Sequence, residues 1–467
     1  MTTVSRLPGG TRMERLSLST LDLLDAAARP PVRPGDVGAG ILHLGLGAFH
    51  RAHQAVYTEE AIAAAGGDWG IVGVAPRSRA VLDPLLEQDL LYSVLTLDGT
   101  RAQGRVCGAL TGALHAASDP DAVVARIADP DIRIVTLTVT EKAYRPDSAV
   151  LGLLVRGLAA RAATGAPIAL VSCDNLAGNG KRLRGLVTRA LPSAAEHVSF
   201  PGTTVDRIVP AGTEDTHACA ASLLGVEDRA AVAAEPFSQW VIEDDFPGGR
   251  PAWERAGAVM TADAAPYERL KLRVLNGVHS ALAYLGALAG APTIDRALAL
   301  PGMRATMERL IEADIAPTLE PPPGLSIERY GLSALDRFAN SALRHRTLQV
   351  AMDGTQKLPQ RLLGTIADRR AAGALPRYAA LVLAAWMRFV RGTADDGSPL
   401  PLDDPLADRI RATPSLLDLH EIFPPGFADD TELRAEIARW ARELDRHGVA
   451  TILRAVSADL PTSGARD

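Results

Sequence analysis

The chain has 467 residues, with 49 Lys and Arg against 55 Asp and Glu, a formal net charge of −6 and 47% hydrophobic residues. This length exceeds one ordinary hydrophobic core and predicts at least two domains. The balance of charge gives no basic footprint for nucleic acid or for an anionic membrane. Three cysteines at no metal-ligand spacing (Cys107, Cys173 and Cys219) argue against a disulfide framework and favour a reducing compartment.

Targeting and membrane signals are weak throughout the chain. The N-terminal stretch MTTVSRLPGGTRMERLSLST has no apolar run long enough for a signal peptide. The most apolar later stretch, residues 379–390, is interrupted by Arg388 and is far too short to cross a bilayer. We therefore expect a cytoplasmic protein that acts on a small molecule.

The first half of the chain alternates short β-rich runs with helical stretches. This alternation predicts an α/β domain with a wound, mostly parallel sheet. The last two runs are almost continuously apolar, as expected for strands that are covered on both faces. The candidate strands are residues 41–44, 71–74, 132–137 and 168–172.

A glycine-rich turn, GLGAFH at residues 45–50, follows the first of these strands directly. Glycines there allow a tight turn and let the backbone approach a pyrophosphate, which makes the domain Rossmann-like. His50 stands where the usual fingerprint has its third glycine, so an ordinary strand-to-helix turn remains the alternative. The cofactor contacts expected here come from Gly45, Gly47, Ala48 and Phe49.

Two histidines of this turn, His50 and His53, are spaced as metal ligands on one helix face could be. No nearby carboxylate or cysteine completes a ligand set. We therefore expect no metal site.

The residues after the second strand bear on the choice between NAD and NADP. An acid at this place bonds the ribose 2′-hydroxyl of NAD, whereas an arginine accommodates the 2′-phosphate of NADP. Residues 74–80 read VAPRSRA, with Arg77 and Arg79 and no acid. Taken alone, the segment points towards NADP or dual use, and two solvated surface arginines are the alternative.

After about residue 260 the β signal fades and long helical patterns dominate. The predicted organisation is a dinucleotide-binding domain over residues 1–260 and a mainly α-helical substrate and catalytic domain over residues 261–467. Within the latter, apolar residues of residues 430–448 recur at spacings of 4, 3 and 4, typical of one helix stripe. Asp430 or Thr431 is the expected N-cap and Gly448 the expected C-cap.

The most informative helical stretch carries Lys271, Asn276 and His279 on an otherwise apolar background. At 100° per residue the three project at about 0°, 140° and 80°, within one arc of an α-helix. Oxidising an alcohol to a ketone needs a base for the hydroxyl proton and donors where alkoxide character develops. A desolvated lysine can be that base without zinc. The alternative is a surface lysine, a capping amide and a core histidine.

Two further polar positions follow candidate strands. Asn175, in SCDNL at residues 172–176, closes a strand, where ligands bind in open α/β sheets. It could donate to a substrate oxygen. Asp206 precedes Arg207, a pattern that by itself is usually only a surface pair.

Together these segments resemble the mannitol dehydrogenase family of polyol-specific long-chain dehydrogenases, which includes mannitol 2-dehydrogenases and fructuronate (mannonate) reductases. The resemblance covers about residues 40–460 through several motifs in the same order. The matching stretches are GLGAFHRAHQAVY (45–57), LTVTEKAY (137–144), SCDNLAGNG (172–180), FPGTTVDRIVP (200–210), EPFSQWVIEDDFPGGRPAWE (235–254), KLRVLNGVHSALAYLG (271–286) and DGTQKLPQR (353–361).

The resemblance implies roles for individual residues. Lys271 would be the general acid/base, while Asn276 and Asn175 would polarise the reacting oxygen. His279 and Asp206 would contact substrate or tune the lysine. The family works without metal and uses NAD by default. Ala80 stands near the position where mannitol-oxidising members often carry an aspartate that favours NAD, which keeps NADP open.

The substrate end of the resemblance lies in a basic stretch. Lys357 matches a substrate-contacting lysine of the family. Residues 343–349 resemble the version found in fructuronate reductases, and Gln349 stands where well-known mannitol dehydrogenases have an arginine. Arg344, Arg346 and Lys357 could hold a sugar-acid carboxylate, with a basic surface helix as the alternative. Arg344, His345 and Lys357 are thus the expected substrate contacts.

The sequence therefore predicts a zinc-independent, NAD(P)-dependent oxidoreductase that interconverts a secondary alcohol and a ketone. Its substrate would be an open-chain polyol or sugar acid, with mannitol and mannonate as the main candidates. Three alternatives stay open: a nicotinamide-binding sensor without turnover, a pentitol dehydrogenase of the same family and, disfavoured by the cysteines, a zinc-dependent polyol dehydrogenase. The sequence leaves the oligomeric state undecided.

Overall fold

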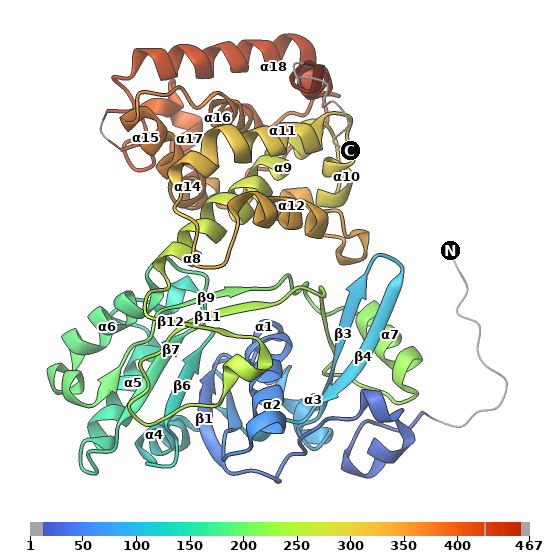
Figure 1. Cartoon of the computed structure of the whole chain (residues 1–467), viewed down its shortest axis with the longest axis vertical. Coiled ribbons are helices and arrows are strands. Elements are labelled where there is room, and N and C mark those ends of the chain that lie inside the picture. The colour runs from blue at the N-terminus through green and yellow to red at the C-terminus, as the bar shows by residue number, and fades with distance from the viewer. Residues whose placement is uncertain (1–12, 425, 459–467) are drawn as a thin grey trace. The chain divides into compact units, whose positions relative to one another are not determined.

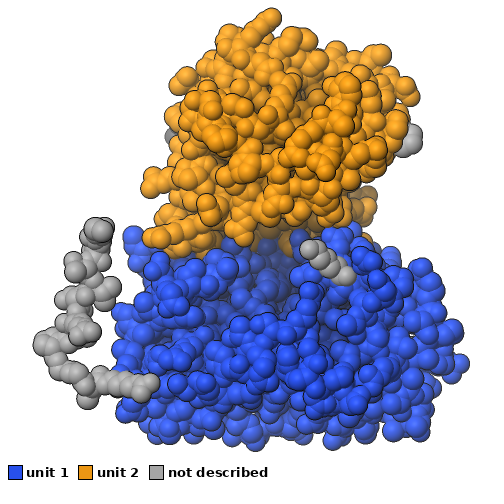
Figure 2. All heavy atoms as spheres, turned by 180° about the vertical axis from the view of Figure 1, so that it is seen from behind, with its two compact units in different colours: residues 1–264 blue, residues 265–467 orange. Residues whose placement is uncertain are grey.

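The computed structural model describes residues 13–424 and 426–458 of the chain. It divides into two compact units, Met1–Ala264 and Ala265–Asp467, which are coloured separately in Figure 2. The first twelve residues, which belong to the stretch searched for a signal peptide, lie outside the described part. Among the described residues, no helix has the length and apolar character needed to span a membrane.

The main sheet of the first unit has six strands in the order β5-β2-β1-β6-β7-β8, and every neighbouring pair is parallel. Numbered within this sheet alone, that order is 3-2-1-4-5-6, the classic order of a Rossmann fold. All four predicted strands are present, at β1, β2, β6 and β7. The six strands are β1 Ala39–Leu44, β2 Gly70–Ala75, β5 Leu110–His115, β6 Ile134–Leu137, β7 Ile168–Ser172 and β8 Val198–Ser199.

Alternation along these strands supplies two separate cores, one on each face of the sheet. In β7, Ala169 and Val171 join one hydrophobic cluster, whereas Ile168 and Leu170 join the other. Every residue of β7 is nevertheless buried. Because successive side chains of a strand point to opposite faces, a strand covered on both sides must be apolar throughout.

Two smaller sheets complete the strands of the first unit. A β3–β4 hairpin, inserted between the second and third strands of the main sheet, pairs antiparallel, and β10 lies parallel to β3. In the other sheet β11 lies between β9 and β12. These strands were not predicted individually. Their bounds are β3 Tyr92–Asp98, β4 Arg101–Cys107, β9 Thr203–Asp206, β10 Val232–Ala234, β11 Gln239–Glu243 and β12 Val259–Thr261.

Helices follow the strands of the first unit in the order expected of a wound fold (Figure 1). The α-helices are α1 Ala48–Ala52, α2 Gln54–Ala65, α3 Leu82–Glu87, α4 Pro120–Ala128, α5 Ala149–Arg161, α6 Asn179–Ala190 and α7 Glu214–Leu224. Short 3₁₀ turns are η1 Leu18–Leu23, η2 Ala26–Ala28, η3 Glu141–Ala143, η4 Pro192–Glu196 and η5 Trp253–Ala256.

The described residues of the second unit form helices joined by loops, which confirms the predicted, mainly α-helical character. Its α-helices are α8 Ala265–Leu270, α9 Gly277–Leu288, α10 Ile294–Leu298, α11 Met303–Arg309, α12 Ile327–Phe338, α13 Thr347–Ala351, α14 Gly354–Leu358, α15 Gly364–Ala371, α16 Arg377–Phe389, α17 Ala407–Ala412 and α18 Thr431–Ala458. Its 3₁₀ turns are η8 Ala316–Thr318, η9 Ser341–Leu343 and η11 Leu416–Asp418.

Helix α9 is the centre of this unit. It contacts α10, α13, α16 and α18, and every residue from Gly277 to Leu288 is buried except His279, which is partly buried. A helix enclosed on all sides must be apolar nearly all round. The polar residues it does carry therefore need a specific reason.

Three segments of the second unit are π-helical: η6 Lys271–Asn276, η7 Leu310–Ile315 and η10 Pro359–Leu363. Segment η6 contacts both of the others. Each extra residue of a π-turn changes which side chains share a face, and such turns occur frequently at functional sites. The three π-helical segments therefore lie together near the N-terminal end of α9.

The predicted C-terminal helix is confirmed at both of its ends. The backbone N–H of Leu433 donates to Asp430 Oδ1 at 3.0 Å, so Asp430 is the N-cap. Gly448 has a φ of 68° and interrupts α18 at the predicted stop. The helix then resumes, which the sequence analysis did not anticipate.

The packing of α5 on α4 gives a test of the first unit's core. A Cβ added at Gly157 would lie 2.4 Å from Ile127 Cβ, whereas one added at Gly152 of the same helix meets nothing within 4 Å. We expect Gly157→Ala to destabilise the protein by about 1–3 kcal/mol through overpacking. Gly152→Ala should leave stability unchanged or raise it by up to about 1 kcal/mol. Urea unfolding measures both, and equal midpoints for the two variants would contradict this packing.

Candidate active site

The glycine turn after β1 contains two glycines with different needs. Gly45 has a φ of 108°, and a Cβ there would lie 2.0 Å from the carbonyl oxygen of Thr138. Gly47 has a φ of −91°, and a Cβ there would meet only Gly45 O, at 3.7 Å. The fold itself therefore requires glycine at position 45. At position 47 nothing inside the protein requires it.

Gly45 and Gly47 line a cavity of about 860 Å³ at the carboxyl ends of β1, β2, β5 and β6. Its volume lies in the range of small-molecule and cofactor sites. The residues that line it are Gly45, Leu46, Gly47, Ala75, Pro76, Arg77, Ser78, Val81, Ala116, Ala117, Pro120, Thr138, Val139, Thr140, Ala143, Ser148, Ala149, Val150, Gly152, Leu153 and Arg156. None of them is acidic.

The two arginines after β2 have different surroundings. Arg77 lines the cavity, and its guanidinium forms no ion pair with the described residues. Arg79 does not line it and pairs with Asp83 at 2.7 Å, one turn along the chain. A cation at this end of the cavity therefore comes from Arg77 rather than from both.

Ala48 and Phe49 begin α1 but do not line the cavity. The Phe49 ring stacks on His53 at 5.0 Å, and His50 stacks on His43 at 3.3 Å. Burial lowers the pKa of His43 to about 3 and also lowers that of His50. The His43 and His50 rings are therefore neutral and pack against each other. Among the described residues, no cluster of three or more His, Cys, Asp or Glu could hold a metal ion.

The segment after β7 places Asp174 and Asn175 at the carboxyl end of the sheet. The Asp174 carboxylate accepts hydrogen bonds from the backbone N–H of Val139 at 3.1 Å and of Thr140 at 2.9 Å. It also accepts one from the Tyr144 hydroxyl at 2.7 Å. Asn175, the next residue, is exposed. Sequence reasoning singled out Asn175 and missed its neighbour.

Asp206, the remaining predicted residue of the first unit, ends β9. It is buried, at 3% exposure, and lies opposite Gln239 of β11 in the antiparallel pair. The neighbouring Arg207 is no surface partner, since its guanidinium donates to the carbonyl oxygens of Ala52 and Glu235. Asp206 therefore lies inside the fold, contrary to the simplest interpretation of an Asp-Arg pair.

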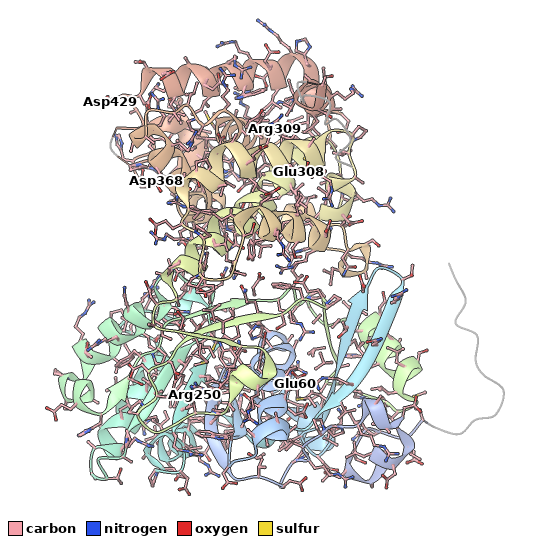
Figure 3. All side chains as sticks on the ribbon, viewed as in Figure 1. Glu60, Arg250, Glu308, Arg309, Asp368 and Asp429 are labelled. Atoms are coloured by element: carbon pink, nitrogen blue, oxygen red, sulfur yellow. The ribbon has the colours of Figure 1, made fainter. Side chains whose placement is uncertain are left out.

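In the second unit, Lys271 and Asn276 are the first and last residues of the π-helical segment η6. The α-helical projection of the sequence analysis is therefore wrong between these two residues. Both are buried, at 7% exposure each. Arg273, on the same segment, donates to Thr318 O at 3.2 Å and pairs with Asp368, labelled in Figure 3, at 2.6 Å. This ion pair fastens η6 to α15.

Asn276 and His279 carry polar atoms that the described residues leave unsatisfied. Asn276 Nδ2 and His279 Nε2 are both buried without a hydrogen-bond partner, and so is the hydroxyl of Tyr284 on the same helix. An unpaired buried polar group costs about 1–3 kcal/mol. Atoms of this kind mark places where a ligand can complete the hydrogen bonding.

His279 is held between two rings. It stacks on Phe338 of α12 at 4.6 Å and meets His345 edge-on at 4.8 Å. Burial and then the charges of His345, Arg361, Lys357 and Arg337 lower the pKa of His279. The structure thus brings the predicted residues His279, His345 and Lys357 together, with a neutral imidazole at the centre.

Of the predicted basic cluster of Arg344, Arg346 and Lys357, only Lys357 lies near His279. Its ammonium donates to the carbonyl oxygens of Val350 at 3.2 Å and Met352 at 2.5 Å, whereas Arg344 and Arg346 are exposed. Arg361, which sequence reasoning missed, donates to Ser280 Oγ at 3.0 Å. The signal was available, because Arg361 follows Lys357 by four residues within the motif DGTQKLPQR.

The fold, the cavity at the glycine turn and the polar residues around His279 are those of a dehydrogenase with a Rossmann-type domain and a helical domain that bears a buried lysine. Comparison with known families agrees. Residues 39–255 match the model of the mannitol dehydrogenase Rossmann domain, and residues 263–439 match that of the mannitol dehydrogenase C-terminal domain. The chain belongs to the mannitol dehydrogenase family and is an oxidoreductase that acts on CH–OH groups.

Individual relatives are similar over nearly their whole lengths. D-mannonate oxidoreductase of Escherichia coli is 39% identical over 88% of this chain and 93% of that protein. Mannitol 2-dehydrogenase of Phaeosphaeria nodorum is 33% identical over 94% of this chain and 85% of that protein. The structure of Pseudomonas fluorescens mannitol 2-dehydrogenase in ternary complex with NAD and D-mannitol superposes with a TM-score of 0.85, at 34% identity, over 96% and 100% of the two chains.

The surroundings of Lys357 give a pH-dependent test. Burial and then the charge of Arg361 lower the pKa of Lys357 to about 8. Since only the neutral amine is nucleophilic, the acylation rate of Lys357 at pH 8 should be about half of its limiting rate at high pH, whereas an ordinary lysine is less than about 1% neutral at pH 8. Peptide mapping by mass spectrometry measures the modification, with the exposed Lys181 as the reference for accessibility. A midpoint above pH 10 for Lys357 would contradict this environment.

Proposed function

We propose that the chain is a zinc-independent, nicotinamide-dependent dehydrogenase that reversibly oxidises a secondary alcohol of an open-chain polyol or sugar acid to the ketone. Lys271 is its general acid/base. The observation that carries the proposal is the set of unpaired buried atoms, Asn276 Nδ2 and His279 Nε2, on the helix that continues from Lys271. A developing alkoxide is the partner that such donors fit.

The cavity at the glycine turn supports the binding of a dinucleotide. A Cβ at Gly47 would fill space that the protein leaves open on the wall of this cavity. The glycine therefore fits a ligand backbone that approaches closely. When bound, a nicotinamide cofactor accepts or gives the hydride. NAD is the cofactor in the complex of Pseudomonas fluorescens mannitol 2-dehydrogenase. Arg77 lines the cavity and no acidic residue does, so NADP is the second candidate.

The residues of the chain have separate tasks in this mechanism. Lys271 takes the proton of the substrate hydroxyl on Nζ during oxidation and returns it during reduction. The side chain of Lys271 is buried, at 7% exposure, and the neutral form of an amine is the form that accepts a proton. Asn276 donates a hydrogen bond to the reacting oxygen through its unpaired Nδ2. His279 stays neutral and orients the substrate, because its neighbours are cationic.

A further observation favours a sugar acid over an uncharged polyol. Arg361 donates to Ser280 Oγ, and among the described residues no carboxylate forms an ion pair with it. Desolvation lowers the pKa of its guanidinium, which means that its charge lacks compensation. A desolvated guanidinium is stabilised best by a carboxylate that accepts two hydrogen bonds. Lys357 lies close enough to Arg361 to add a second cation.

Replacement of the base tests the reaction type. We expect Lys271→Ala to lose at least about a hundredfold in kcat, the contribution of a general base, while the cofactor still binds to the separate Rossmann unit. Lys181→Ala, at an exposed position of α6, is the matched control and should keep full activity. Steady-state rates followed at 340 nm and a cofactor titration measure both effects. Turnover of Lys271→Ala close to that of the wild type would overturn the mechanism and favour a sensor.

Replacement of Arg361 tests the substrate class. Fructuronate and fructose differ in the carboxylate, so their kcat/KM ratio isolates it when each is screened with NADH and with NADPH. We expect the wild type to prefer fructuronate, and Arg361→Gln to lose about tenfold or more on fructuronate, the scale of a hydrogen bond to a charged group. Its activity on fructose should change by less than about threefold.

The matched control for this substitution is Arg344→Gln, which removes an exposed guanidinium and should leave the ratio unchanged. A wild type that prefers fructose or mannitol would assign the protein to polyols. A pentulose that outcompetes both sugars would assign it to pentitols.

A further inference from the structure

We propose that Asp174 is a positioning residue that holds the loop of residues 138–140 in the shape that binds the dinucleotide. This inference rests on the proposed function, because it assumes that the cavity takes a nicotinamide cofactor. It concerns a carboxylate that does not line the cavity itself.

The carboxylate joins two neighbouring strand ends. Asp174 follows β7, and the loop follows β6, which pairs with β7 in parallel. Two oxygens of one side chain accept three hydrogen bonds, from the backbone N–H groups of Val139 and Thr140 and from the Tyr144 hydroxyl. The Tyr144 hydroxyl also meets Ser172 Oγ at 2.5 Å, at the last residue of β7. The loop and the following residue Tyr144 are therefore both tied to the segment at the carboxyl end of β7.

The conformation of the loop needs such a restraint. Thr140 has a φ of 69°, a left-handed conformation that is unfavourable for a β-branched residue. Residues in such conformations persist only where the surroundings fix them. The hydrogen bond from Thr140 N to Asp174 acts directly on the strained residue. Without an acceptor there, the backbone is free to relax to a negative φ.

The loop is also part of the cavity wall. Thr138, Val139, Thr140 and Ala143 all line the cavity. Thr138 Oγ1 donates to the carbonyl oxygen of Gly45 at 2.8 Å. A shift of the loop would therefore reach the glycine turn as well as the wall beside it.

A carboxylate is costly at this position, which argues for a purpose. Burial raises the pKa of the Asp174 carboxyl, against the lowering effect of its three donors. Burial and the Asp174 charge also raise the pKa of Tyr144. An asparagine would have a similar shape, but its NH₂ group would face backbone N–H donors and could not accept from them.

The test compares three single variants of the full chain by fluorescence titration with NADH and NADPH, well below their thermal unfolding temperatures. We expect Asp174→Asn to raise the Kd of the cofactor by about tenfold or more, the scale of a lost hydrogen bond to a charged acceptor. Tyr144→Phe removes one donor and should raise the Kd by a smaller factor. Asp98→Asn, at an exposed position that ends β3, is the control and should match the wild type.

Kinetics separate a positioning role from a general loss of structure. Asp174→Asn should raise the KM for the cofactor, while kcat at saturating cofactor stays within about threefold of the wild type. If the substitution only destabilised the protein and left the loop intact, the unfolding temperature would fall while the Kd and the KM for the cofactor stayed unchanged. That result, or an unchanged Kd for Asp174→Asn, would overturn the proposal.

Two further outcomes remain decisive. If Asp174→Asn does not fold, an unchanged Kd for Tyr144→Phe overturns the proposal and a raised Kd supports it. A wild type that binds neither NADH nor NADPH would overturn the proposed function together with this inference. If the wild type binds a cofactor and Asp174→Asn binds it with the same Kd, this inference alone is overturned.

Discussion

The enclosure of helix α9 sets the cost of every polar atom on it. This helix is surrounded by α10, α13, α16 and α18, so its side chains are cut off from water on nearly every side. Unpaired polar groups are expensive in such a place. Asn276, His279 and Tyr284 nevertheless each keep a buried atom without a partner. The second unit thus keeps three unpaired polar atoms along η6 and α9, and the proposed function gives them a ligand as their partner.

The π-helical segment η6 belongs to the same constraint. It begins at Lys271 and ends at Asn276, immediately before α9. The Arg273–Asp368 ion pair and the hydrogen bond to Thr318 hold it from the side of the neighbouring helices. A rigid support of this kind keeps a buried lysine in place, because the turn cannot relax without breaking these contacts. The chemistry proposed for Lys271 depends on that rigidity.

In the first unit the feature that matters most is the cavity at the carboxyl ends of the parallel strands. The parallel sheet places the ends of four strands around one cavity, and glycine at position 47 leaves room on its wall. The loop after β6 completes this wall in a strained conformation, and the Asp174 carboxylate ties the loop to β7. Asp174 thus supports the cavity wall through the loop backbone and the Tyr144 hydroxyl without lining the cavity itself.

The sequence by itself determined the elements whose signals are local. Short β-rich runs located β1, β2, β6 and β7, and the spacing of apolar residues with a capping aspartate located the helix that begins after Asp430. The same reasoning placed Gly45 and Gly47 on a turn and Lys271 beside Asn276 and His279. Each of these inferences depends on residues that are neighbours in the chain, where strand and helix periodicities apply.

Only the tertiary structure decided which distant residues meet. The structure shows that Arg344 and Arg346 are exposed and that Arg361 is the arginine near His279. It also shows that the segment from Lys271 to Asn276 is a π-helix and not an α-helix. It also connected Asp174 to a loop more than thirty residues earlier in the chain. Neither the path of the chain between strands nor the insertion of one residue into a helical turn has a periodic signal. Contacts of this kind follow from packing, which a single sequence does not display.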